Sequence, residues 1–68
     1  MKHTKKQVID SFLFMSFNFH ALTPDAKKST IERMRECMQE YASMHGASRD
    51  RLSCMAVILN QHQDEINK

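Results

Sequence analysis

The chain has 68 residues, which limits it to one small domain that buries little apolar surface on its own. Its formal net charge of +2 is too small to indicate a polyanionic partner. Two cysteines, Cys37 and Cys54, do not make the dense pattern of a disulfide-stapled secreted domain. We therefore expect a cytoplasmic chain in which both thiols fill small apolar spaces. A single disulfide between Cys37 and Cys54 is the alternative.

The N-terminus carries the excess of positive charge and resembles the start of a signal peptide. Residues 1–7 hold three lysines and no acidic residue, and an apolar run begins at Val8. Polar residues interrupt this run, however, and no small-x-small cleavage site follows it. The run is also shorter than the roughly 20 apolar residues that a membrane-spanning helix needs. We expect residues 1–4 to form a basic tip, with neither a cleaved leader nor a membrane span.

The first expected element is a Phe-rich helix over residues 5–19. Its apolar positions recur at spacings of four, three and four, which is one face of a helix, at Val8, Phe12, Met15 and Phe19. Phe14 and Phe17 fall on a different face, so the helix needs cover on more than one side. In so small a chain a second subunit is the natural cover. A strand is the alternative, because Phe favours strands and alternates in places, but the helical period fits better.

The second expected helix spans residues 24–45. Thr23 is suited to cap it, Pro24 to occupy its first position, and Asp25 to complement the positive end of the helix dipole. Its apolar seam follows a 3-4-3-4 spacing through Ile31, Met34, Met38, Tyr41 and His45. The opposite face is charged and is expected to be solvated.

Gly46, the only glycine, is expected to end the second helix in a left-handed conformation. Ser48 then caps a third helix over residues 49–66. The third helix repeats the 3-4-3-4 spacing at Leu52, Met55, Leu59, His62 and Ile66. Two helices joined by so short a bend have their seams facing each other, which predicts an antiparallel helical hairpin. The predicted fold is therefore all-α: residues 1–68 form one domain of three helices, a hairpin with an additional N-terminal helix, associated as a dimer.

Catalytic and metal-binding patterns are missing from the sequence. Its four histidines and two cysteines show no CxxC, HxxxH or HExxH spacing. His45 and His62 are expected at the seam edge with a polar nitrogen in solvent. We find no nucleophile elbow, glycine-rich phosphate loop or paired carboxylates. We expect no catalytic, cofactor-binding or metal-binding residues, and the chain is not predicted to be an enzyme.

Residues 41–55 resemble the helix-turn-helix of DNA-binding regulators. Ala42 stands four residues before the turn glycine, a serine follows the turn, and Leu52 and Met55 occupy apolar positions. The resemblance covers about a quarter of the chain, and it implies that residues at the start of a recognition helix would face the major groove, namely Ser48, Arg49, Arg51 and Ser53. Any bend between two helices needs the same glycine and serine, and the segment has no basic stripe. DNA binding is therefore the alternative function.

The function favoured by the sequence is protein binding. We expect a small non-catalytic interaction or regulatory protein, of the accessory kind that bacteria and phages encode, which binds itself as a homodimer and an unidentified protein. Binding would use apolar helix faces, and Met-rich surfaces adapt readily to partners. The expected interface residues are Phe12, Phe14, Phe17, Met34, Met38 and Leu59.

Overall fold

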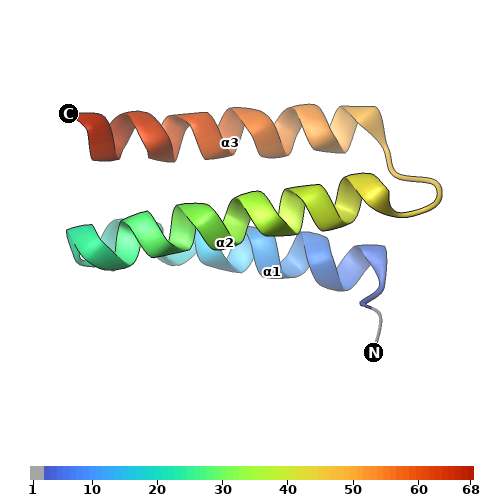
Figure 1. Ribbon diagram of the computed structural model, residues 1–68, viewed down its shortest axis with the longest axis horizontal. Coiled ribbons are helices and arrows are strands. Elements are labelled where there is room, and N and C mark those ends of the chain that lie inside the picture. Colours follow the sequence, from blue (N-terminus) through green and yellow to red (C-terminus); the bar gives the residue numbers. More distant parts are fainter. Residues whose placement is uncertain (1–2) are drawn as a thin grey trace.

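The computed structural model describes residues 3–68, and Met1 and Lys2 of the expected basic tip lie outside the described residues (Figure 1). Its elements are α1 (Lys5–Asn18), the short 3-10 helix η1 (Phe19–Ala21), α2 (Pro24–Ser43) and α3 (Arg49–Asn67). Residues 3–68 contain no strand, so the strand alternative for the first segment is wrong. The predicted all-α class with three helices is confirmed.

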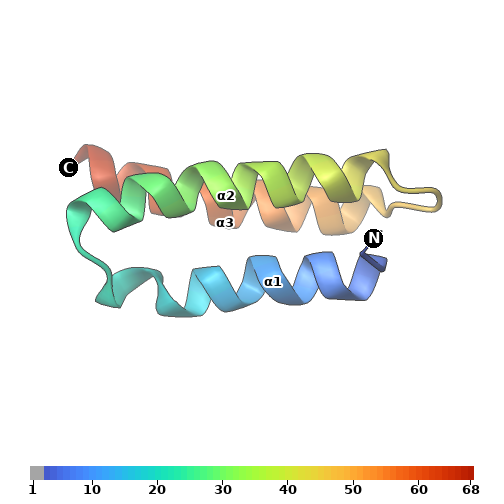
Figure 2. The same ribbon diagram turned by 60° about the horizontal axis from the view of Figure 1, so that its bottom comes forward.

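The three α-helices lie along the long axis of a molecule that measures 36 × 24 × 15 Å (Figures 1 and 2). Each helix runs in the opposite direction to the one before it, so α1 and α3 run in the same direction. The start of α1 therefore lies near the loop between α2 and α3, whereas the C-terminus lies near the turn between α1 and α2.

The start of α1 is fixed by a capping box that the sequence analysis did not anticipate. The Gln7 backbone N–H donates to the Thr4 hydroxyl at 3.1 Å, and the Thr4 backbone N–H donates to the Gln7 side-chain oxygen at 2.9 Å. The helix ends at Asn18, one residue earlier than expected, because the chain tightens there into η1. Phe19 remains buried in η1.

The second helix begins as predicted but ends two residues early. Thr23 caps it, because its hydroxyl accepts a hydrogen bond from the Ala26 N–H at 3.2 Å. The helix stops at Ser43, since Met44 is extended with φ −79° and ψ 145°. Gly46 is left-handed as expected, with φ 79°, but it lies within the loop rather than at the helix end. His45, expected on the seam, is consequently exposed in the loop.

Contacts from α1 and α2 hold the loop between α2 and α3. The Ser48 backbone N–H donates to the hydroxyl of the buried Tyr41 at 2.9 Å. The Lys5 ammonium, at the start of α1, donates to the His45 carbonyl at 3.1 Å. These bonds give partners to two backbone groups of the loop, the Ser48 N–H and the carbonyl of His45, which the early end of α2 leaves outside the helix.

One apolar core joins all three helices. Its members lie on the faces predicted from the helical period, and they are Val8, Phe12, Phe19, Ile31, Met34, Tyr41, Met55 and Leu59. Phe12, Phe19 and Met34 form its fully enclosed centre. Among residues 3–68, no helix is both long and apolar enough to cross a bilayer.

Candidate functional site

Large apolar side chains remain in solvent after this core has closed. Phe17 is 82% exposed, Phe14 61% and Val57 56%. Phe14 and Phe17 project from α1, and Val57 from α3. Isolated exposed apolar residues are common on protein surfaces, so their significance depends on what lies around them.

Phe17 and Val57 belong to apolar rows on neighbouring helices. On α1, Ile9, Leu13 and Phe17 are four residues apart, so they share one side of the helix. On α3, Cys54, Val57 and Ile58 lie at spacings of three and four and share one side. We name these six residues the α1–α3 strip.

A shallow groove runs between the two rows of the α1–α3 strip. It has a volume of about 170 Å³ and is lined by Ile9, Leu13, Asp50, Arg51, Cys54, Met55 and Ile58. Asp50 and Arg51 come from the first turn of α3, so they mark one end of the groove. A second hollow of about 450 Å³ shares Cys54 and Ile58 with this groove and continues over α3 to Val57 and Gln61. The two hollows therefore connect five of the six strip residues, and Phe17 lies one helical turn beyond Leu13.

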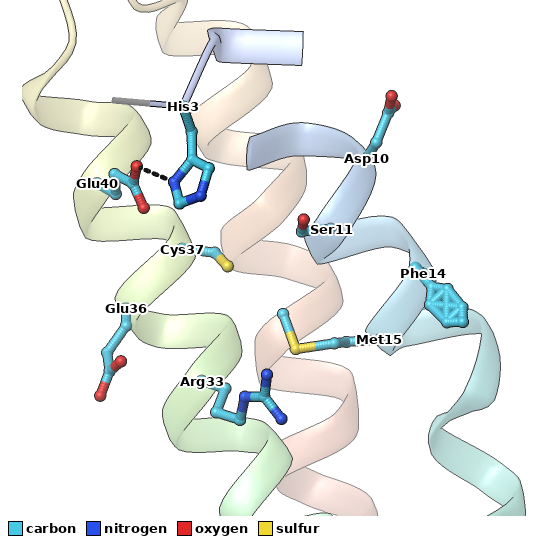
Figure 3. Close-up of a pocket in the computed structure, with 9 residues that line it drawn as sticks. All are labelled: His3, Asp10, Ser11, Phe14, Met15, Arg33, Glu36, Cys37 and Glu40. Atoms are coloured by element: carbon cyan, nitrogen blue, oxygen red, sulfur yellow. Dashed lines mark hydrogen bonds and ion pairs between the residues drawn. The ribbon is translucent and has the colours of Figure 1, made fainter. Parts of the chain in front are cut away.

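A second groove, between α1 and α2, differs in chemistry. It measures about 610 Å³ and is lined by His3, Asp10, Ser11, Phe14, Met15, Arg33, Glu36, Cys37 and Glu40 (Figure 3). Four of its nine lining residues are charged, and the Nδ1 atom of His3 lies 2.9 Å from the Oε2 atom of Glu40. Burial and, secondarily, the Glu40 carboxylate raise the pKa of the Cys37 thiol, which disfavours the reactive thiolate.

His62 is enclosed, contrary to the expectation that its ring nitrogen would face solvent. Its side chain stacks on Phe19 with ring centroids 4.2 Å apart, and its Nε2 atom lies 2.9 Å from the Ser16 hydroxyl. Burial, followed by the nearby His20, lowers the pKa of His62. The Ser16–His62 pair lines neither groove and packs against Phe19, which fits a role in holding α1 on α3.

An ion-pair cluster covers the outer side of this histidine. Glu65 lies 2.9 Å from Nδ1 of His20 and 3.1 Å from Nζ of Lys27, so the cluster joins η1, α2 and α3. The hydrogen bond from Lys27 is the main cause that lowers the pKa of Glu65. The Lys27 ammonium also lies 5.6 Å from the centre of the Phe19 ring. The cluster closes the end of the bundle at which η1 lies.

The expected interface residues divide into two groups. Phe12 and Met34 are fully buried and Leu59 is 6% exposed, so these three belong to the chain's own core and offer no surface to a partner. Met38 is half-buried, whereas Phe14 and Phe17 are exposed. The remaining five residues of the strip were not proposed as interface residues, although their four-residue spacing is present in the sequence.

The residues of the DNA-binding alternative lie at the start of α3. The Ser48 hydroxyl caps this helix by accepting from the Arg51 N–H at 3.3 Å, while Arg49, Arg51 and Ser53 are exposed. The helices α2 and α3 lie side by side along their length (Figures 1 and 2). The two helices of a helix-turn-helix cross at about 90–120°. The arrangement therefore differs from the motif that residues 41–55 resemble.

Comparisons with family models, curated proteins and solved structures give no match for this chain. Among residues 3–68, no three His, Cys, Asp or Glu side chains are grouped as a metal ion requires. The α1–α3 strip is therefore the feature on which a functional proposal rests.

Proposed function

We propose that the chain is a small non-catalytic interaction protein that regulates by binding, both to itself as a homodimer and to a second protein, through exposed apolar helix faces. The observation that carries the proposal is the 82% exposure of Phe17, one helical turn beyond Leu13, which lines the apolar groove of the α1–α3 strip. Burying one Phe side chain contributes about 1.5–3 kcal/mol, so covering Phe17 would add a substantial part of the free energy of binding to a partner.

The core supports this proposal because it closes without the exposed residues. Phe12 and Phe19 fill the centre of the core, so Phe14 and Phe17 add nothing to the burial of the isolated chain. The finer fold expected from the sequence suits the same purpose: an antiparallel hairpin of α2 and α3 is a stiff base on which α1 presents its outer face. We place this binding in the cytoplasm, where reducing conditions keep Cys37 and Cys54 as the free thiols of the structure.

The test compares three immobilised proteins: the wild type, Phe17→Asp and the matched control Gln39→Glu. Gln39 is exposed on α2, and both substitutions add one negative charge. Proteins retained from an extract of the source cells, with the chain itself included, are quantified by mass spectrometry. We expect specific proteins that the wild type and Gln39→Glu retain and Phe17→Asp loses. Equal retention by all three proteins would refute the proposal.

DNA binding through Ser48, Arg49, Arg51 and Ser53 stays the alternative prediction. No contact in the structure favours it over protein binding, and Asp50 lies between the two arginines in sequence, where it would face phosphates unfavourably.

A further inference from the structure

We propose that the α1–α3 strip seats a second copy of this chain in the reverse direction, with the two-fold axis passing beside Leu13. This inference rests on the proposed function and names the face and orientation of the self-association. Three independent features carry it: the spacing of the strip, the distribution of charge along it, and the exposed area of the chain.

The row on α1 is self-complementary about Leu13. Ile9 precedes Leu13 by four residues and Phe17 follows it by four, so a two-fold axis across α1 at Leu13 brings each Phe17 opposite the other copy's Ile9. Ile9 lines the groove of about 170 Å³, whereas Phe17 projects into solvent. The same face therefore carries the protruding Phe17 ring at one end and the groove beside Ile9 at the other. The two-fold axis places the ring of each copy over the groove of the other. Each Phe17 ring would enter the groove of the other copy.

Charge along the strip favours the reverse direction. Because α1 and α3 run the same way, the exposed Lys6 and the Arg51 at the groove end lie at one end of the molecule (Figure 2). The exposed Asp64 and the half-buried Glu65 lie near the end of α3, at the opposite end. A reversed copy brings the exposed Lys6 of one chain toward the exposed Asp64 of the other, whereas a copy in the same direction places Lys6 near Lys6. Arg51 adjoins Asp50 at the groove end and Glu65 is already paired with Lys27, so neither adds to this difference. The attraction between Lys6 and Asp64 thus favours the reversed orientation.

The exposed area of the chain matches what one subunit of a dimer buries. A compact monomer of 8.0 kDa is expected to expose about 4,450 Å². This chain exposes 5161 Å², which is about 700 Å² more than that expectation. A standard specific interface removes about 800 Å² from each partner. A symmetric contact of standard size would therefore remove an area comparable with this surplus.

Cysteine cross-linking tests the orientation. In a Cys37→Ala, Cys54→Ala background, Leu13→Cys places identical residues beside the axis, within the Cα separation of about 7 Å that a disulfide allows. We expect Leu13→Cys to form covalent dimers under mild oxidation, and Ile9→Cys mixed with Phe17→Cys to form the mixed dimer. Phe17→Cys alone, and Gln39→Cys on the opposite side, should remain monomeric on a non-reducing gel. Circular dichroism confirms that each variant is folded.

The outcomes separate this proposal from the proposed function. Preferential self-linking of Phe17→Cys would show that the copies run in the same direction and would overturn the proposal. A strict monomer at tens of micromolar, with no cross-link at Leu13→Cys, would also overturn it. If Phe17-dependent capture of another protein persisted in that case, the strip would serve a different partner. The binding of a second protein in the proposed function would then stand, and its homodimer would be refuted. If neither the Leu13→Cys cross-link nor Phe17-dependent capture of another protein were observed, both proposals would be refuted.

Discussion

The Nε2 atom of His62 lies 2.9 Å from the hydroxyl oxygen of Ser16, and this bond joins α3 to α1. The stacking of His62 on Phe19 fixes the ring plane, so the bond also fixes how the two helices face each other. The apolar groove lies nearer the other end of the same two helices, beside Asp50 and Arg51. The Ser16–His62 bond therefore helps to set the spacing of the two rows that form the strip.

Replacing Ser16 by Ala should destabilise the fold by about 1–2 kcal/mol, because it leaves a buried imidazole nitrogen without its partner. Ser29→Ala is the matched control on the exposed surface of α2 and should change the free energy of unfolding by less than about 0.5 kcal/mol. Urea unfolding followed by circular dichroism measures both. Equal stability of the two variants would contradict a structural role for the bond.

Stability should fall on acidification because of His62. Its pKa is lowered in the folded chain, chiefly by burial, so the unfolded chain binds a proton more readily than the folded one. The stabilisation is complete above the ordinary histidine pKa of about 6.5 and is lost as pH falls through the lower folded value. His20, Lys27 and Glu65 surround the ring from η1, α2 and α3, and Ser16 contacts it from α1.

The measurement is the free energy of unfolding between about pH 7.5 and about pH 5 for the wild type and His62→Phe. His62→Phe keeps the stacking on Phe19 but cannot take a proton. We expect a smaller loss of stability for His62→Phe over this range. An identical pH dependence of the two proteins would show that His62 is not responsible.

Gly46→Ala should destabilise the chain by about 1–2 kcal/mol, because the residue has φ 79° and an added Cβ disfavours this conformation. The new Cβ would also lie 2.8 Å from the Lys5 ammonium. Lys5 can move aside, but it then loses its bond to the His45 carbonyl. Gly46→Asn, which tolerates left-handed backbone better, should cost less in urea unfolding. Equal stability of Gly46→Ala and the wild type would contradict this account of the loop.

The helical period predicted the fold because each helix of this chain buries one regular face. Val8, Phe12 and Phe19 lie in the core, as their spacing indicates, and Thr23 caps α2. The helical period does not reveal where a helix ends, because the end depends on hydrogen bonds that loop residues make to other parts of the chain. The hydroxyl of Tyr41 and the ammonium of Lys5 reach residues seven and forty positions away in sequence, and such contacts depend on the packed fold.

The candidate site was predicted only in part. We expected the hairpin to leave Phe14 and Phe17 unburied, and both side chains are exposed. Phe12 and Met34 were expected at an interface because the packing of α1 across α2 and α3 was not specified by the sequence pattern. The four-residue spacing that places Ile9 beside Leu13 is visible in the sequence, but the groove requires α3 alongside, which only the structure gives.

Duplex DNA should not bind this chain. The balanced charge of residues 48–68 and the lack of a basic stripe leave little attraction to phosphates. Fluorescence anisotropy of a labelled random duplex at low salt checks this for the wild type and for Arg49→Ala and Arg51→Ala. We expect no change in anisotropy for any of them. Salt-sensitive binding by the wild type that both substitutions weaken would instead support the helix-turn-helix alternative.

The most direct test of binding through the α1–α3 strip is analytical ultracentrifugation of the wild type, Phe17→Asp and Gln39→Glu over a range of concentrations. The wild type and Gln39→Glu should reach twice the chain mass of 8.0 kDa as concentration rises, while Phe17→Asp stays at the single-chain mass. Self-association through the strip is contradicted if the wild type keeps the single-chain mass throughout, or if Phe17→Asp self-associates as strongly as the wild type.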